Sequence, residues 1–211
     1  MKKTAESDRR KIGVLALQGD FAEHAAVLDS ISVDATQVRL PEQLTALDGL
    51  IIPGGESTTI ARLMAEWSLL EPIRARAREG MAIWGTCAGA ILLAERAGDL
   101  DREGLRLMDI TMERNAFGRQ VDSFEVAIDV PAIGVPPFHA VFIRAPRIVS
   151  VGAKARVLAT LSNGTIVAAQ QDKLLATSFH PELTDDTRFH EYFVRLASSK
   201  RPISATAQAA G

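Results

Sequence analysis

Short apolar runs alternate with segments of helical periodicity along the first half of this 211-residue chain. Strands are predicted at residues 12–17, 33–40, 50–52 and 81–84, and helices at residues 21–31, 57–67, 71–78 and 88–95. A continuous apolar run suits a strand that is buried on both faces, and helical crossovers make neighbouring strands parallel. The pattern therefore predicts an α/β fold with a mostly parallel sheet and helices on both faces.

After about residue 105 the pattern changes to short strand-like runs separated by turns. The predicted strands are residues 124–130, 140–144, 156–161, 165–170 and 174–178, and Ser-Asn-Gly at 162–164 is a strong hairpin signal. A last helix is predicted at residues 186–196. We expect one domain over residues 12–198 with an antiparallel extension, and flexible termini at residues 1–11 and 199–211.

Charge and cysteine content limit the partners and the compartment. The net charge of −2 gives no electrostatic footprint for nucleic acid or an anionic membrane surface. A single cysteine can form neither an internal disulfide nor a thiolate zinc site, which favours a reducing cytoplasm. Residues 1–11 lack the apolar stretch of a secretion signal, and the longest uncharged apolar run, residues 81–94, is shorter than a membrane span of roughly 20 residues. We expect a cytoplasmic protein.

The cysteine lies at a predicted strand-to-helix turn, where Gly85 and Gly89 flank Cys87 at two positions on either side. This is the spacing of a nucleophile elbow, with cysteine in place of serine. Glycines allow strand and helix to approach closely, and a helix N-terminus favours the thiolate. A buried cysteine that only fills space is the alternative, but it does not account for the two glycines. Cys87 is the candidate nucleophile.

A cysteine nucleophile needs a base, and His180 is the best placed of the four histidines. It follows a predicted strand, and Pro181 favours extended backbone at His180, so Glu182 projects to the same side. Glu182 could then fix the imidazole tautomer and stabilise its charged form. Sites in open α/β sheets form at the carboxyl ends of strands, which supports this placement.

The other histidines have no comparable partner in the sequence. His24 and His190 fall on predicted helices, where a solvated or packed side chain is expected, and His139 has no acidic neighbour. His180, Glu182 and His190 lack the regular spacing of a zinc site on one helix, and no second cysteine is present. We therefore predict no metal.

Residues 53–58, Pro-Gly-Gly-Glu-Ser-Thr, follow another predicted strand. Two adjacent glycines can turn a backbone N–H towards an anion, as in an oxyanion hole, and the N–H of Ala88 would be the second donor. A plain turn followed by a helix cap at Ser57 or Thr58 fits the segment equally well. The segment lacks the lysine and the spacing of a phosphate loop, so nucleotide hydrolysis is not supported.

Together, residues 85–89, 53–58 and 179–183 resemble the triad-type (class I) glutamine amidotransferases. Residues 13–21, 114–120 and 142–146 are more narrowly similar to the glutaminase subunits of pyridoxal 5'-phosphate synthase. The resemblance implies a three-layer, flavodoxin-like sheet and hydrolysis of L-glutamine to glutamate and ammonia without a cofactor. It further implies that the ammonia passes to a synthase subunit with a multimeric core, for vitamin B6 biosynthesis.

Carried onto this sequence, the resemblance implies that Cys87 is the nucleophile, His180 the acid/base and Glu182 its orienter. It implies that the oxyanion is held by Gly55 and Ala88, and that glutamine is bound by Gly55, Glu56, Ser57, Arg114, Ile143 and Arg144. Two alternatives stay open: a glutaminase that feeds another synthase, and a non-catalytic module on the same fold whose cysteine senses oxidation.

Overall fold

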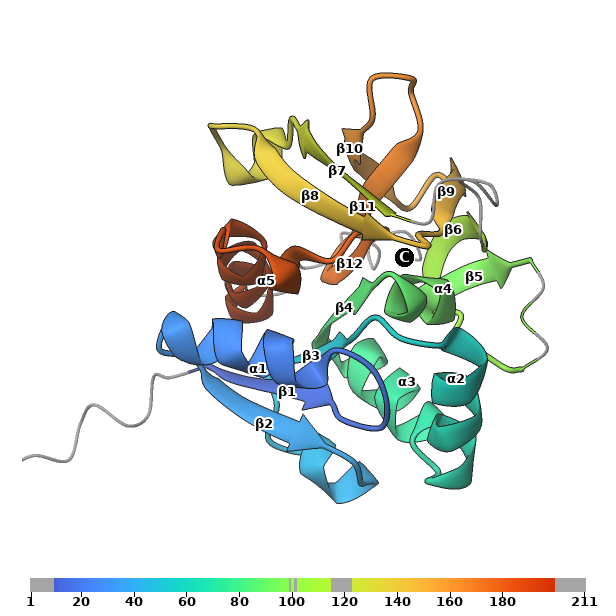
Figure 1. Ribbon diagram of the computed structural model, residues 1–211. Coiled ribbons are helices and arrows are strands. Elements are labelled where there is room, and N and C mark those ends of the chain that lie inside the picture. Colours follow the sequence, from blue (N-terminus) through green and yellow to red (C-terminus); the bar gives the residue numbers. More distant parts are fainter. Residues whose placement is uncertain (1–9, 99, 101, 115–122, 200–211) are drawn as a thin grey trace, which may run out of the picture.

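The computed structural model describes residues 10–98, 100, 102–114 and 123–199. Its main sheet has a parallel part built from five strands: β1 (Lys11–Leu15), β2 (Asp34–Val38), β3 (Gly49–Ile52), β4 (Ala82–Thr86) and β12 (Leu174–Thr177). They lie in the order β2-β1-β3-β4-β12, and each pairing is parallel (Figure 1). Thr177 of β12 lies beside Thr86 of β4, so the segments that follow these two strands emerge side by side.

Helices cover both faces of this sheet, which confirms the predicted three-layer α/β architecture. Helices α2 (Ser57–Glu66), α3 (Leu70–Glu79) and α4 (Ala88–Leu93) pack on one face, and α1 (Phe21–Ser30) and α5 (Arg188–Ser198) pack on the other (Figure 1). Side chains alternate between the two cores because successive strand residues point to opposite faces. Ile83 of β4 packs with α2 and α4, whereas Trp84 packs with α1 and α5.

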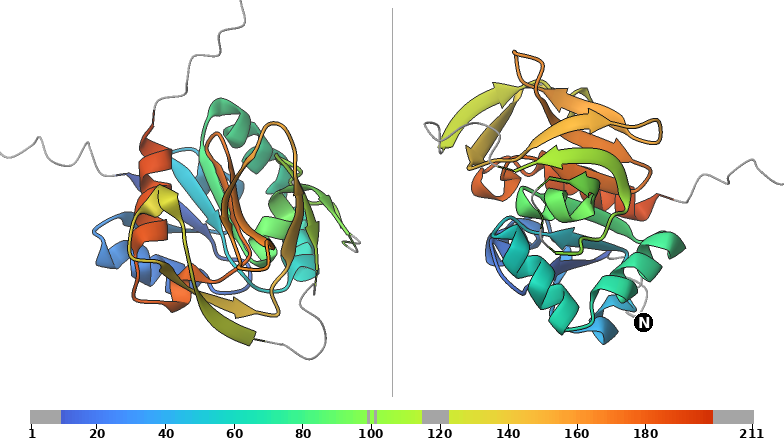
Figure 2. Two further views of the ribbon diagram at one scale, coloured as in Figure 1. Left: turned by 90° about the horizontal axis from the view of Figure 1, so that it is seen from above. Right: turned by 90° about the vertical axis from the view of Figure 1, so that its right-hand side faces the viewer.

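The rest of the sheet continues from β12 through β11 (Ile166–Gln171), β9 (Arg147–Val151), β6 (Met108–Glu113) and β5 (Ala94–Ala97), with β10 (Arg156–Thr160) paired to β11. These pairings are antiparallel except for that of β5 with β6. A separate two-stranded sheet consists of β7 (Ser123–Ile128) and β8 (Phe138–Ile143). The predicted antiparallel extension is thus confirmed, and Figure 2 shows it gathered at one end of the molecule.

The predicted Ser-Asn-Gly turn joins β10 to β11. Leu161 and Thr165 close the hairpin, with a 2.9 Å hydrogen bond from the Leu161 N–H to the Thr165 carbonyl. Gly164 has φ of +83°, in the left-handed region that favours glycine. Within the described residues, three short 3₁₀ turns lie between the longer elements: η1 (Pro41–Leu44), η2 (Pro131–Ile133) and η3 (Pro181–Leu183).

Several boundaries differ from the sequence prediction. The helix predicted for residues 88–95 ends at Leu93, because Ala94 turns to extended backbone and starts β5. Strands β5, β6 and β9 were not predicted; each is short or interleaves charged residues with its buried ones. Residue 11, expected in the flexible terminus, begins β1, and its N–H donates to the Asp48 carboxylate over 3.0 Å. Most of both predicted flexible termini lies outside the described residues.

None of the described helices is long and apolar enough to cross a lipid bilayer.

Candidate active site

The turn between β4 and α4 holds Cys87 in a strained conformation. Its φ of 47° and ψ of −106° lie in a region that costs a non-glycine residue about 1–3 kcal/mol. A 2.8 Å hydrogen bond from the Cys87 N–H to the Thr177 carbonyl of β12 fixes the turn. A Cβ on Gly85 would collide with the Gly89 backbone, and one on Gly89 with the Ile52 carbonyl, so both positions require glycine. The geometry is that of the predicted nucleophile elbow.

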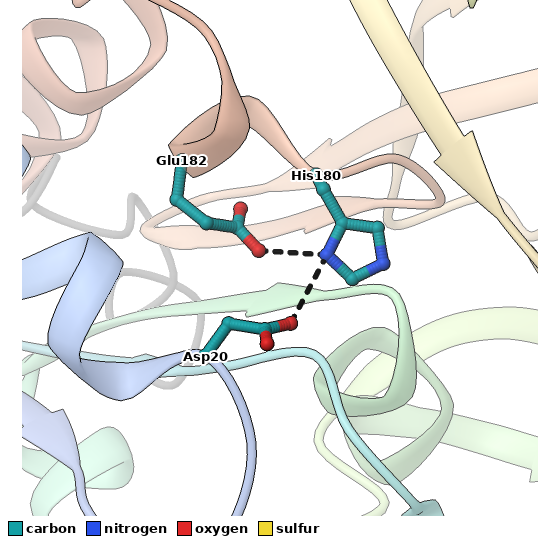
Figure 3. A group of neighbouring side chains, drawn as sticks. All are labelled: Asp20, His180 and Glu182. Carbon is teal, nitrogen blue, oxygen red and sulfur yellow. Dashed lines mark hydrogen bonds and ion pairs between the residues drawn. The ribbon is translucent and has the colours of Figure 1, made fainter.

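His180 and Glu182 form the predicted pair after β12. Nδ1 of His180 lies 2.7 Å from Oε1 of Glu182, and the His180 backbone N–H donates to the Val141 carbonyl of β8 over 2.8 Å. A second carboxylate, Asp20, lies 3.3 Å from the same ring nitrogen. Figure 3 shows both carboxylates aimed at Nδ1, with the other ring nitrogen on the far side of the imidazole. The other ring nitrogen, Nε2, is therefore free of these two carboxylates and can exchange a proton with another group.

The environment of His180 favours its charged form. Burial alone would lower the pKa of the imidazole, but interactions with Asp20, Cys87 and Glu182 outweigh burial and raise this pKa to about 12. Cys87 lines the same cavity as His180, and its thiol is one of the groups that raise the pKa of the imidazole. Such a pair can exist as a thiolate and an imidazolium, which is the reactive state of a cysteine nucleophile.

Glu182 is almost fully enclosed, and two opposing effects set its pKa. Burial raises the pKa of the carboxyl, while the hydrogen bond and the charge of His180 lower it; the net direction is upward. The hydrogen-bonding partners of Glu182 therefore favour its ionised form against the effect of burial.

A cavity of about 480 Å³ opens over these groups. Its lining includes all but one of the residues predicted for the site: Gly55, Glu56, Ser57, Cys87, Ala88, Arg114, Ile143, Arg144 and His180. Glu182 lies behind His180 and does not line the cavity. The volume suits a small-molecule substrate.

Five further residues line the cavity and were not singled out as site residues from the sequence: Gln18, Asp20, Ile91, Pro146 and Leu183. Gln18 and Asp20 follow β1, at the same edge of the sheet as Cys87 and His180. Their position at the carboxyl end of a parallel strand was the signal that could have identified them.

The segment that connects β1 to α1 contacts the Gly54–Gly55 segment from two sides. The Asp20 N–H donates to the Gly54 carbonyl over 3.1 Å, and the Gln18 side-chain oxygen accepts from the Glu56 N–H over 2.8 Å. Gly19 must be glycine, because a Cβ there would overlap the Gly54 carbonyl. Gly55 has φ of +151°, so the predicted oxyanion segment has a conformation that glycine tolerates best. Ala88 lies in the first turn of α4, where backbone N–H groups have no intrahelical partner.

Glu56 caps α2, where the sequence had predicted Ser57 or Thr58 as the cap. Its carboxylate accepts from the backbone N–H groups of Thr58 and Thr59 over 3.1 and 2.6 Å. Burial opposes ionisation, but the hydrogen bonds from Thr59 and Thr58 together outweigh it and lower the pKa of the carboxyl. Arg114 approaches the same carboxylate to 3.4 Å, so opposite charges meet at the cavity wall. The predicted segment of residues 114–120 is otherwise outside the described residues.

Of the other three histidines, two are packed, which is one of the states expected for them, and one differs from the prediction. His24 and His190 are fully buried on α1 and α5, and His24 contacts both His190 and Glu182. His139 was predicted to lack an acidic neighbour, which is wrong: Glu125 of the paired strand β7 lies 2.7 Å from its Nε2. Sequence neighbours do not reveal this contact, because it crosses between two strands.

Asp20, His180 and Glu182 also place three potential metal-ligating atoms within 4.8 Å of one another. The histidine nitrogen in this group is the one that faces both carboxylates, and a proton on it satisfies them without an ion. The arrangement suits proton transfer better than metal binding, and the absence of a metal stays a prediction.

Comparison with known proteins identifies the family of this site. Residues 14–199 match the model of the SNO glutamine amidotransferase family. The chain belongs to this family. Two curated relatives, both called pyridoxal 5'-phosphate synthase subunit PdxT, come from Herpetosiphon aurantiacus and Chloroflexus aurantiacus and are 62% and 58% identical over 188 residues. Each alignment covers 88% of this chain and 99% of the relative.

Solved structures agree with this family and its fold. A crystal structure of a glutamine amidotransferase is 48% identical and superimposes with a TM-score of 0.85, covering 89% of this chain and 99% of that one. The structure of PurLQS from Thermotoga maritima has a TM-score of 0.67, with coverage of 89% and 98%, but only 14% identity, so it supports the fold alone. Members of the family share the class I amidotransferase architecture predicted from the sequence.

Proposed function

We propose that this chain hydrolyses L-glutamine to L-glutamate and ammonia, as the glutaminase subunit of pyridoxal 5'-phosphate synthase. The observation that carries the proposal is the meeting of Cys87, on its strained turn, with His180 at one cavity. The names of the relatives at 62% and 58% identity support the synthase assignment. Release of glutamate and ammonia from glutamine by the purified chain with its synthase partner is the direct test.

The proposed chemistry has two stages. The Cys87 thiolate attacks the side-chain amide carbon of glutamine, and the resulting oxyanion accepts hydrogen bonds from the N–H groups of Gly55 and Ala88. His180 donates a proton to the nitrogen as the C–N bond breaks, which releases ammonia and leaves a thioester. His180 then takes a proton from water, the hydroxide attacks the thioester, and glutamate leaves as the thiol is restored.

Charged groups at the cavity wall match the ends of glutamine. The α-carboxylate requires a cation, and Arg144 and Arg114 both line the cavity. The α-ammonium requires an anion, and Glu56 lines the same cavity in its ionised form. Ser57 and Ile143 complete the proposed substrate-binding set.

Replacing Arg144 with glutamine is expected to raise the KM for glutamine by about 10- to 100-fold, because one charge-assisted hydrogen bond is lost. The kcat should change much less, since the reacting amide lies at the other end of the substrate. Steady-state kinetics in the presence of the synthase subunit measure both constants. Arg147→Gln is a suitable control, because Arg147 pairs with Glu113 on the surface. A fall in kcat at constant KM would contradict the assignment.

The synthase subunit is the proposed partner, within a hetero-oligomeric complex built on a multimeric synthase core. The Gly54–Gly55 peptide must direct an N–H at the oxyanion, and loss of one such donor typically costs about 10²- to 10³-fold in rate. We propose that docking sets this peptide in its active orientation, which prevents waste of glutamine by the free chain.

The isolated chain is therefore expected to turn over glutamine about 10²- to 10³-fold more slowly than the chain with its synthase subunit. Ammonia release measured at increasing synthase concentration should saturate at a fixed stoichiometry. Equal turnover with and without the partner would contradict activation by docking. A pull-down that recovered a different synthase would instead support the alternative of a glutaminase that serves another amidotransferase.

A further inference from the structure

Two histidines that the proposed reaction does not use lie directly behind Glu182. His24 on α1 and His190 on α5 are both fully buried, with Nδ1 of His24 2.9 Å from Nε2 of His190. Nε2 of His24 faces the other way, 3.3 Å from Glu182 Oε2 and 3.2 Å from the Thr86 hydroxyl. Helices α1 and α5 lie on the same face of the sheet, which brings these rings together (Figure 1).

One carboxylate oxygen of Glu182 lacks a hydrogen-bond donor among the described residues. Oε1 is engaged by His180, but Oε2 is buried and has no well-aligned hydrogen-bond partner within the described part of the chain. A buried carboxylate oxygen without a donor is costly, and the cost falls on the ionised form. The Nε2 atom of His24 is close enough to supply that donor after a small rotation of its ring.

The hydrogen-bond pattern selects one tautomer for each histidine. If His24 carried its proton on Nδ1, its Nε2 lone pair would face the Glu182 carboxylate, and His190 would need a buried N–H on Nδ1. Nδ1 of His190 has no partner among the described residues, so that arrangement leaves two groups unsatisfied. With both protons on Nε2, His190 donates to His24, and His24 presents an N–H to Glu182 and Thr86.

Both rings are held in the neutral state that this arrangement requires. Burial lowers the pKa of His190 to about 3. Burial, followed by the nearby charges of His190 and His180, lowers the pKa of His24 well below its ordinary value. Neither imidazole therefore competes with His180 for the proton at neutral pH.

We infer that His24 is a positioning residue for glutamine hydrolysis: its Nε2–H, oriented by His190, supports the ionised Glu182 that in turn orients His180. The inference rests on the proposed glutaminase function. The inference adds one hydrogen-bond donor, His24, behind Cys87, His180 and Glu182. It also gives His190 a role, which is to orient His24.

Two amide substitutions separate this role from simple packing. In His24→Asn the side-chain amide reaches only the Nδ1 position, towards His190, whereas in His24→Gln it reaches the Nε2 position, towards Glu182. We expect His24→Asn to lower kcat by about 10- to 100-fold with little change in KM, and His24→Gln to recover most of the loss. His139→Asn is the control and should retain wild-type kinetics, because the His139 side chain is exposed on β8.

The pH profile gives a second measurement. Glu182 faces His180 and Asp20 on one side and His24 on the other, with His190 behind and Cys87 beyond His180. Without the His24 donor, the Glu182 carboxyl protonates more readily. The acidic limb of the pH profile of kcat should therefore move to higher pH in His24→Asn and lie again at its wild-type position in His24→Gln.

Kinetics are measured with the synthase subunit present, and thermal unfolding is followed for each variant. Equal kcat for His24→Asn and His24→Gln, with the acidic limb unmoved, would overturn the positioning role and leave the glutaminase function standing. A wild-type complex that releases no ammonia from glutamine would overturn the proposed function and this inference together.

Discussion

Replacement of Cys87 by alanine is expected to lower glutamine hydrolysis by about 10⁴- to 10⁶-fold, to the level that binding alone supports. Alanine removes the sulfur that forms the thioester, and no other residue that lines the cavity is a cysteine. Folding should be retained, because the turn is fixed by backbone contacts to Thr177 and by the flanking glycines. Ammonia release with the synthase subunit measures the effect.

A matched control separates the sulfur from the fold. Ala90 on α4 is fully buried next to the elbow, and Ala90→Ser changes the same helix while leaving the Cys87 sulfur in place. The control should keep most of the activity, while Cys87→Ala should still dock with the synthase in a binding assay. Substantial ammonia release by Cys87→Ala would remove the residue from its assigned role, and selective labelling of Cys87 by a reactive glutamine analogue would support it.

Glu182→Gln is expected to lower kcat by about 10³- to 10⁴-fold, since a neutral amide neither fixes the tautomer of His180 nor stabilises the imidazolium. Asp20 lies 3.3 Å from the same nitrogen, against 2.7 Å for Glu182, and it is more exposed to water. Asp20→Asn alone should therefore have the smaller effect, about 10-fold.

The double variant tests whether the two carboxylates share one task. If Asp20 partly replaces Glu182, the combined loss should exceed the product of the single losses. Steady-state kinetics of the four proteins measure this coupling. Full activity in Glu182→Gln would show that Asp20 is the true orienter, and the triad would then be reassigned.

The features predicted correctly were local in the sequence. Gly85, Cys87 and Gly89 encode the elbow within one turn, and His180 with Glu182 encodes its pair within three residues. Short-range patterns of this kind depend on backbone sterics, which the sequence specifies directly.

Other features depended on contacts between distant segments. His24 reaches Glu182 only because α1 packs against η3 and shares a core with α5, which no local pattern encodes. The contact of His139 with Glu125 likewise depends on the pairing of two strands, which the residues next to His139 in the sequence do not reveal. Of the three unpredicted strands, β5 and β9 are short and show no clear alternation, whereas β6 does alternate apolar and polar residues, a strand signal that the prediction missed.

The parallel pairing of β12 with β4 has a consequence for the nascent chain during synthesis. Synthesis produces the sulfur-bearing turn early, but its imidazole partner arrives only with the final strand, which must insert beside β4 before the two can meet. Truncated or unfinished copies should therefore be unable to consume glutamine, so a cell loses none of its nitrogen donor to incomplete molecules.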